Sequence, residues 1–176
     1  MGIKTQVPEP NDPADTVLDD YLTIKQAREE LEIGRMNGCR CPVCGRYAKV
    51  YQRKITSAMA YGLILLSKTN GWIHIEDFFK AKKNIPSSIR GDISKLRVWE
   101  LLERKRNSKN EKEDTNPNNG YYAITQKGRD FVNGVISVEK HAYIWNDTCL
   151  RFSDEQTTIQ EALTDKFNYA EILGGI

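Results

Sequence analysis

Three aliphatic residues recur at spacings of four and three within a mostly polar stretch, and this pattern constrains the fold more than any other. The residues are Ile89, Ile93 and Leu96. Because an α-helix advances about 100° per residue, these spacings place all three side chains on one side of a helix. The helix is expected to span Ser87–Val98, since serine at its start can cap the first N–H groups. The pattern predicts one buried side and one outward side.

The sequence on both sides of this helix predicts short elements. Before it, one helical stripe is formed by Ile55, Ala58, Met59, Gly62, Leu63 and Leu66, and Asn70-Gly71 ends that helix. After it, β-favouring residues predict two strands around a polar loop. The remaining expected elements are a strand at Trp72–Ile75, a helix at Glu76–Lys82, strands at Leu101–Arg106 and Gly120–Thr125, and a helix that Thr125 caps and that ends near Gly134.

Two segments of this series resemble winged-helix regulators, including the MarR type. Ser94–Arg104 resembles the end of a recognition helix that runs into the first strand of a wing. Tyr121–Arg129, with its Ile-Thr-Gln-Lys-Gly sequence, resembles the second wing strand and the following helix. The resemblance covers a little under half of the chain and implies an α+β fold with a winged helix-turn-helix core. The chain departs from this family at Trp99-Glu100, where many winged helices carry a glycine.

The chain as a whole also resembles small proteins of bacteriophages for which no activity is established. The residues that carry this resemblance are Cys41-Pro42-Val43-Cys44-Gly45, Lys54-Ile55, Lys95 to Glu103 and Tyr143 to Asn146. The resemblance implies a phage-encoded protein that acts in the host cytoplasm, and it brings no function with it.

The outward side of the Ser87–Val98 helix carries residues that suit contact with double-stranded DNA. With the aliphatic residues turned inward, the residues that point outward or lie on the flank are Ser87, Arg90, Gly91, Ser94, Lys95 and Arg97. A helix of this kind fits the major groove, where arginine and lysine read guanine or bind phosphate. At the base of the wing, Arg104, Lys105 and Arg106 suit phosphate contacts. The wing tip is a poorer contact, because its acidic residues would repel phosphate.

The same residues also fit a winged helix that binds no nucleic acid. Their charges then form a solvated face on a domain that binds protein, because a fold does not settle function. The leading expectation is a regulator of transcription or replication that binds double-stranded DNA. The alternative is a module for protein–protein interaction, such as a phage factor that modulates a host protein.

The N-terminal part of the chain is expected to be an extension of the core. Residues 1–13 form a loose tail, and Asp15–Met36 is predicted to be an amphipathic helix with acidic residues in its first turn. The apolar face of this helix suits either a homodimer contact or packing onto the winged helix.

The C-terminal part is expected to hold a β-hairpin. Val138–Trp145 and Thr148–Phe152 flank Asn146-Asp147, which suits a two-residue turn. A short helix is expected at Thr158–Leu163, followed by an apolar segment at Phe167–Leu173. The expected divisions of the chain are residues 1–36 for the tail and helix, 37–53 for a cysteine knuckle, 54–135 for the winged helix and 136–176 for the hairpin and short helix.

Three cysteines in a tight turn suggest a structural zinc ion. Cys41 and Cys44 are separated by two residues and followed by Gly45, a spacing that lets two thiolates meet one zinc ion. Cys39 is the expected third ligand, and structural zinc normally takes four. A turn that holds no metal is the alternative.

The fourth zinc ligand is open among Cys149, His141, His74 and a further group that the sequence does not identify. In the predicted hairpin Cys149 pairs with Ile144 and His141 pairs with Phe152. Since side chains alternate between the faces of a strand, Cys149 and His141 should point to opposite sides. These two residues should therefore not bind the same ion.

Composition and charge narrow the remaining classes of function. The formal net charge of +2 at pH 7 neither demands nor excludes nucleic acid, because a local basic face matters more than the total. No apolar run approaches the length that spans a bilayer, and the N-terminus lacks the apolar region of a signal peptide, so a cytoplasmic protein is expected. The two histidines belong to no catalytic constellation, and no phosphate-binding glycine loop is present, so no enzyme activity is expected.

Overall fold

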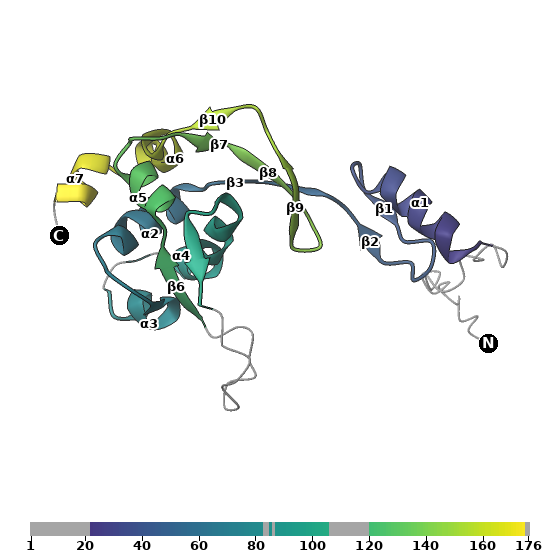
Figure 1. Cartoon of the computed structure of the whole chain (residues 1–176), viewed down its shortest axis with the longest axis horizontal. Helices are drawn as coiled ribbons and strands as arrows, with labels where there is room; N and C mark the ends of the chain where they lie inside the picture. Colours follow the sequence, from purple (N-terminus) through teal and green to yellow (C-terminus); the bar gives the residue numbers. More distant parts are fainter. Residues whose placement is uncertain (1–21, 83–84, 86, 106–119, 175–176) are drawn as a thin grey trace, which may run out of the picture. The chain divides into compact units, whose positions relative to one another are not determined.

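The computed structural model describes residues 22–82, 85, 87–105 and 120–174. The fold is α+β, and the chain divides into two compact units at residues 1–51 and 52–176. The elements carry the labels of Figure 1. Within the described residues, no helix has both the length and the apolar character needed to cross a membrane. The expected tail at residues 1–13 lies outside the described residues.

The first unit contains one helix and one small hairpin. Helix α1 spans Ile24–Gly34, and strands β1 (Cys39–Arg40) and β2 (Tyr47–Ala48) pair in antiparallel fashion. The Thr23 side chain accepts a hydrogen bond from the Gln26 N–H at 3.3 Å, and the Gln26 side chain accepts one from the Thr23 N–H at 2.9 Å. This reciprocal cap starts the helix at Ile24, because it satisfies N–H groups that a helix start leaves unpaired.

The prediction of one continuous helix over Asp15–Met36 is wrong at Leu22 and Thr23, which are not helical. The predicted start of that helix, with its acidic first turn, lies outside the described residues. The prediction failed here because apolar residues recur at helical spacing on both sides of Thr23. The hydrogen bonds of the Thr23 cap nevertheless start a helix at Ile24. Within this unit Ala27 is buried, while Ile24 and Ile33 are 69% and 81% exposed.

The second unit is built from helices around one core and three small sheets. Its helices are α2 (Ser57–Ser67), α3 (Ile75–Lys80), α4 (Ser87–Asp92), the 3₁₀ helix η2 (Ile93–Trp99), α5 (Gln126–Val132), α6 (Ile159–Leu163), the 3₁₀ helix η3 (Thr164–Lys166) and α7 (Tyr169–Gly174). Its strands are β3 (Tyr51–Lys54), β4 (Ile73–His74), β5 (Leu102–Arg104), β6 (Tyr121–Ile124), β7 (Val138–Glu139), β8 (His141–Trp145), β9 (Thr148–Phe152) and β10 (Gln156–Thr157). The sheet orders are β4-β6-β5, β3-β8-β9 and β10-β7.

Strands β5 and β6 form the antiparallel pair that the sequence predicted around the polar loop. Leu102 lies opposite Ile124, and Arg104 lies opposite Tyr122. Strand β4 pairs with the other edge of β6, so β6 is the central strand. Thr125 caps α5 as predicted, by accepting a hydrogen bond from the Gly128 N–H at 2.9 Å. A Cβ atom at Gly128 would overlap the carbonyl oxygen of Leu101, so this close approach requires glycine.

Helix α2 runs through the middle of the core. It packs against α4, η2, α5, α6 and α7 (Figure 1), so it is buried on nearly all sides. The predicted stripe was too narrow, because Ile64 and Leu65 outside it are as buried as Leu63 within it. Gly62 meets α4 and η2 closely, since a Cβ there would lie 2.8 Å from both Ile89 Cγ2 and Ile93 Cδ1.

The Ser87–Val98 segment forms two kinds of helix, not the single α-helix that was predicted. Ile89, Ile93 and Leu96 are fully buried, as predicted. After Asp92 the chain tightens into the 3₁₀ helix η2, which has about three residues per turn. This winding places Ile93, Leu96 and Trp99 on one side, and all three are buried. An α-helix would turn Trp99 well away from Ile93, so burial of the indole favours the tighter winding.

The hairpin of β8 and β9 forms about the predicted Asn146-Asp147 turn. Both turn residues have positive φ, 46° and 58°, as a two-residue hairpin turn requires. Cys149 lies opposite Ile144 as predicted, but Phe152 lies opposite Ala142 and not His141. A bulge in the ladder shifts the register by one residue. Since β8 itself is continuous, His141 and Ile144 still point to opposite faces, and Cys149 shares the face of Ile144.

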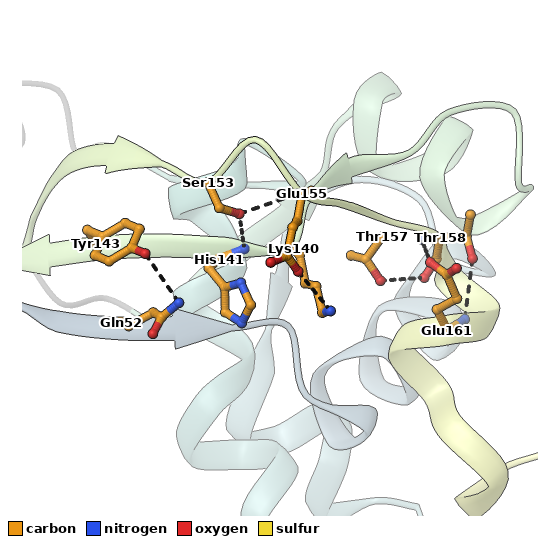
Figure 2. A network of polar contacts seen from close by, with 9 residues as sticks. All are labelled: Gln52, Lys140, His141, Tyr143, Ser153, Glu155, Thr157, Thr158 and Glu161. Carbon is orange, nitrogen blue, oxygen red and sulfur yellow. Dashed lines mark hydrogen bonds and ion pairs between the residues drawn. The ribbon is translucent and has the colours of Figure 1, made fainter.

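Polar contacts tie this C-terminal segment to neighbouring elements (Figure 2). The Gln52 Nε2 atom donates to the Tyr143 hydroxyl at 3.3 Å, between β3 and β8. Lys140 Nζ lies 3.0 Å from Glu155 Oε2. At α6, the Thr158 N–H donates to Glu161 Oε2 at 2.8 Å, and this hydrogen bond holds the pKa of the Glu161 carboxyl below its usual value. Figure 2 shows these contacts, in which the charged side chains of Lys140, Glu155 and Glu161 each have a structural partner.

The C-terminal segment shares the core of the preceding residues. The Trp99 Nε1–H donates to the Glu139 carbonyl at 2.6 Å, and the Trp99 ring lies 6.2 Å from the Phe152 ring. Ile159 and Leu163 of α6 are buried in the same cluster as α2. Residues 136–176 were expected as a separate extension, yet they supply part of one continuous core.

Candidate functional site

The outer side of α4 and η2 carries most of the residues proposed to contact DNA. Arg90, Lys95 and Arg97 are exposed, and Ser94 is half-buried. Lys95 forms an ion pair with Asp92 on the same surface, so its charge is partly compensated. Ser87 opens α4, and its side chain lies outside the described part of the chain.

A hollow at the base of the expected wing brings together residues of η2, of β5 and of the loop before β4. It has a volume of about 680 Å³ and is lined by Trp72, Arg97, Leu102, Glu103 and Arg104. Arg97 comes from η2 and Arg104 from β5, so the fold unites two arginines that the sequence analysis assigned to separate surfaces. Trp72, which sequence reasoning missed, is 43% exposed. A large aromatic residue directly after the Asn70-Gly71 turn was the available signal.

The other predicted wing residues are only partly described. The Lys105 N–H donates to the Tyr121 carbonyl at 3.0 Å, and its Nζ atom lies 5.8 Å from the centre of the Tyr121 ring. These contacts place Lys105 where the ladder of β5 and β6 ends. Arg106 and the acidic wing tip lie outside the described residues.

The cysteine turn is closed by backbone hydrogen bonds. The Cys41 N–H donates to the Arg46 carbonyl and the Gly45 N–H donates to the Cys41 carbonyl, both at 2.8 Å. Gly45 has a φ of 68°, which suits glycine. The backbone N–H groups of Cys44 and Val43 hydrogen-bond the Cys41 sulfur and lower the pKa of its thiol. The turn therefore favours the thiolate that a metal ion would need.

Cys39 does not join this pair. Its Sγ atom lies 2.8 Å from where a Cβ atom on Gly34 would be, so it packs against the end of α1. Across the described residues, no three histidine, cysteine, aspartate or glutamate side chains lie together as a group that could hold a metal ion. Of the three predicted ligands, Cys41 and Cys44 lie in contact with each other, and zinc binding by Cys39, Cys41 and Cys44 stays a prediction.

The candidates for a fourth ligand have structural positions of their own. Cys149 packs against the core of the second unit, and burial raises the pKa of its thiol. His74 Nδ1 lies 2.7 Å from Asp77 Oδ2, and its ring lies 5.2 Å from the Tyr121 ring. His141 lies on β8, on the face opposite Cys149.

Comparison with protein-family models, with curated proteins and with solved structures finds no match to this chain.

Proposed function

We propose that residues 54–135 are a winged-helix domain that binds double-stranded DNA. The order of elements supports this proposal: α2, β4, α3, the pair α4 and η2, β5, β6 and α5. A winged helix uses such a series to set its recognition helix beside a two-stranded wing. In this role α4 and η2 lie toward the major groove, and β5 and β6 form the stem of the wing.

The hollow lined by Trp72, Arg97 and Arg104 is the observation that carries the proposal. Two guanidinium groups on one surface suit a phosphate, because each presents a planar fork of N–H donors. The exposed Trp72 ring offers an apolar face for a neighbouring sugar. Arg90, seven residues before Arg97, is exposed on α4, and in this proposal it reaches base edges.

The test is a titration of fluorescently labelled mixed-sequence duplex DNA at several salt concentrations, read by anisotropy. We expect Arg97→Ala and Arg104→Ala each to weaken binding for all sequences and to reduce the slope of log K against log salt by about 1. Arg90→Ala and Lys95→Ala should weaken binding with some dependence on sequence. Arg151→Ala, which removes an exposed arginine that lies over Tyr143 on the C-terminal hairpin, is the matched control.

The DNA proposal fails if the protein does not bind duplex DNA at low salt. It also fails if the Arg90 and Lys95 variants bind as tightly as the unmodified protein, or if Arg151→Ala weakens binding as much as Arg97→Ala. A regulatory role in transcription or replication of a bacteriophage is the wider function that we propose for such binding.

A protein partner is the second candidate, and the acidic residues on the same face favour it. Asp92 pairs with Lys95, and Glu103 lines the hollow beside Leu102 and Trp72. Such a mixed surface suits a peptide with its own apolar and charged residues. If binding to DNA is absent, a phage factor that engages a host protein through this hollow becomes the favoured function.

A further inference from the structure

The tip of the small hairpin presents a pair of thiols. Cys41 and Cys44 sit at the turn between β1 and β2, Cys44 is exposed, and the neighbouring Val43 is 58% exposed. Backbone hydrogen bonds close the turn, and Arg40 Nη1 donates to the Gly45 carbonyl at 3.1 Å. The pair is thus held in a defined loop at an open end of the hairpin.

This pair supplies half of the ligands that zinc requires. A structural zinc ion takes four ligands in a tetrahedron, and two cysteines separated by two residues reach it from one turn. Cys39 faces Gly34, and the carboxylates of Glu29 and Glu32 on α1 pair with Lys25 and Arg35. Among the described residues of the first unit, no third histidine, cysteine, aspartate or glutamate lies together with these two thiols as a metal-binding group.

The charge in the chain around the turn fits a centre rich in thiolates. Within the first unit, residues 33–51 contain no aspartate or glutamate, and their basic residues are Arg35, Arg40, Arg46 and Lys49. Four thiolates around one Zn²⁺ leave two net negative charges, which nearby arginine and lysine would stabilise. Without the ion, two such basic turns would repel each other.

We infer that the Cys41–Cys44 turn is half of a zinc site, and that the same turn of a second copy of this chain supplies the other two thiolates. A two-fold axis through the ion then relates the copies, and the interface closes at two chains. Binding converts four thiols to thiolates and releases their protons to solvent. This inference does not depend on DNA binding.

The experiment uses the full chain, purified under a reducing agent without chelator, and titrated with Zn²⁺ and separately with Co²⁺. We expect one zinc ion per two chains by native mass spectrometry, and a shift from monomer to dimer by sedimentation that chelator reverses. With Co²⁺, sulfur-to-cobalt charge-transfer absorption should reach the intensity of four thiolates per ion. The intensity of this absorption reports how many thiolates bind each cobalt ion, so this measurement requires no variant.

Two pairs of variants separate the sources of the thiolates. Cys41→Ser and Cys44→Ser should each abolish the dimer at the same zinc concentration. Cys39→Ala and Cys149→Ala are the matched controls and should keep both the dimer and its stoichiometry. Circular dichroism of each full-length variant, compared with the zinc-free unmodified protein, identifies any variant that fails to fold, since Cys39, Cys41 and Cys44 lie in the first unit and Cys149 in the second.

Several results would overturn the inference. These are one zinc ion per monomer, loss of zinc with Cys39→Ala or Cys149→Ala, a dimer that survives chelator, or no binding of zinc or cobalt by the reduced protein.

Discussion

At the scale of single residues, Glu100 adopts a left-handed backbone conformation that glycine usually adopts at the end of a helix. It follows Trp99 at the end of η2 with a φ of 61°, in the left-handed region. The Glu100 N–H donates to the Arg97 carbonyl at 3.0 Å, and the Leu101 N–H donates to the Leu96 carbonyl at 3.2 Å. These bonds close the helix end. Glu100 therefore adopts the left-handed geometry that glycine usually supplies at a helix end, at some conformational strain.

We predict that Glu100→Gly stabilises the protein relative to Glu100→Ala by about 1 kcal/mol, because glycine adopts positive φ without a Cβ clash. Both variants remove the exposed carboxylate that lies 3.4 Å from Lys127 Nζ, so the comparison isolates the backbone. Such an exposed pair contributes little. The measurement is the free energy of unfolding in urea. A Glu100→Ala protein that is the more stable of the two would contradict this account.

At the scale of elements, one glycine decides how closely α5 approaches the start of β5. Gly128 faces the Leu101 carbonyl, whereas Gly91 on the outer side of α4 has open space around it. The Lys127-Gly128 pair, part of the winged-helix resemblance, thus has a packing reason that composition and periodicity do not reveal.

We predict opposite effects for alanine at these two glycines. Gly128→Ala should lower the free energy of unfolding by about 3 kcal/mol, since the backbone carbonyl cannot move aside as a side chain would. Gly91→Ala should raise it by about 0.5–1 kcal/mol, because alanine is the better helix former. Urea unfolding of both variants checks the signs. Equal effects at the two positions would be inconsistent with the packing described here.

At the scale of the whole molecule, the C-terminal segment completes the core of residues 52–176. Val138, Ala142, Ile159, Leu163 and Ile172 are buried against the preceding elements. The Lys68 Nζ atom also donates to the Ile172 carbonyl at 2.7 Å, so α7 is bound to the end of α2. A division of this unit at residue 135 would cut through its core.

We predict that a fragment of residues 52–135 does not unfold cooperatively, whereas residues 52–176 do. Each large aliphatic side chain that becomes exposed lowers the free energy of unfolding by about 2 kcal/mol. The total free energy of unfolding of a domain of this size is only about 5–15 kcal/mol. Circular dichroism in urea distinguishes the two fragments. A sharp transition in the shorter fragment, with the midpoint of the longer one, would show that residues 136–176 are dispensable.

Local patterns were sufficient for the parts of the fold that depend on neighbours in sequence. The spacing of Ile89, Ile93 and Leu96 predicted their burial, Thr125 predicted the start of α5, and Asn146-Asp147 predicted the hairpin turn. Among the site residues, the exposure of Arg90, Lys95 and Arg97 follows from the same periodicity. Each depends on a helical repeat, a cap or a turn, which a few adjacent residues determine.

Only the tertiary structure decided which distant residues meet. Burial of Trp99 against the segment after residue 135 accompanies the change from α4 to η2, and the bulge in β9 moved Phe152 to Ala142. Packing also turned Cys39 toward Gly34 and joined Arg97, Arg104 and Trp72 around one hollow. Contacts between residues far apart in the chain depend on the shape of the assembled core, and no local repeat encodes that shape.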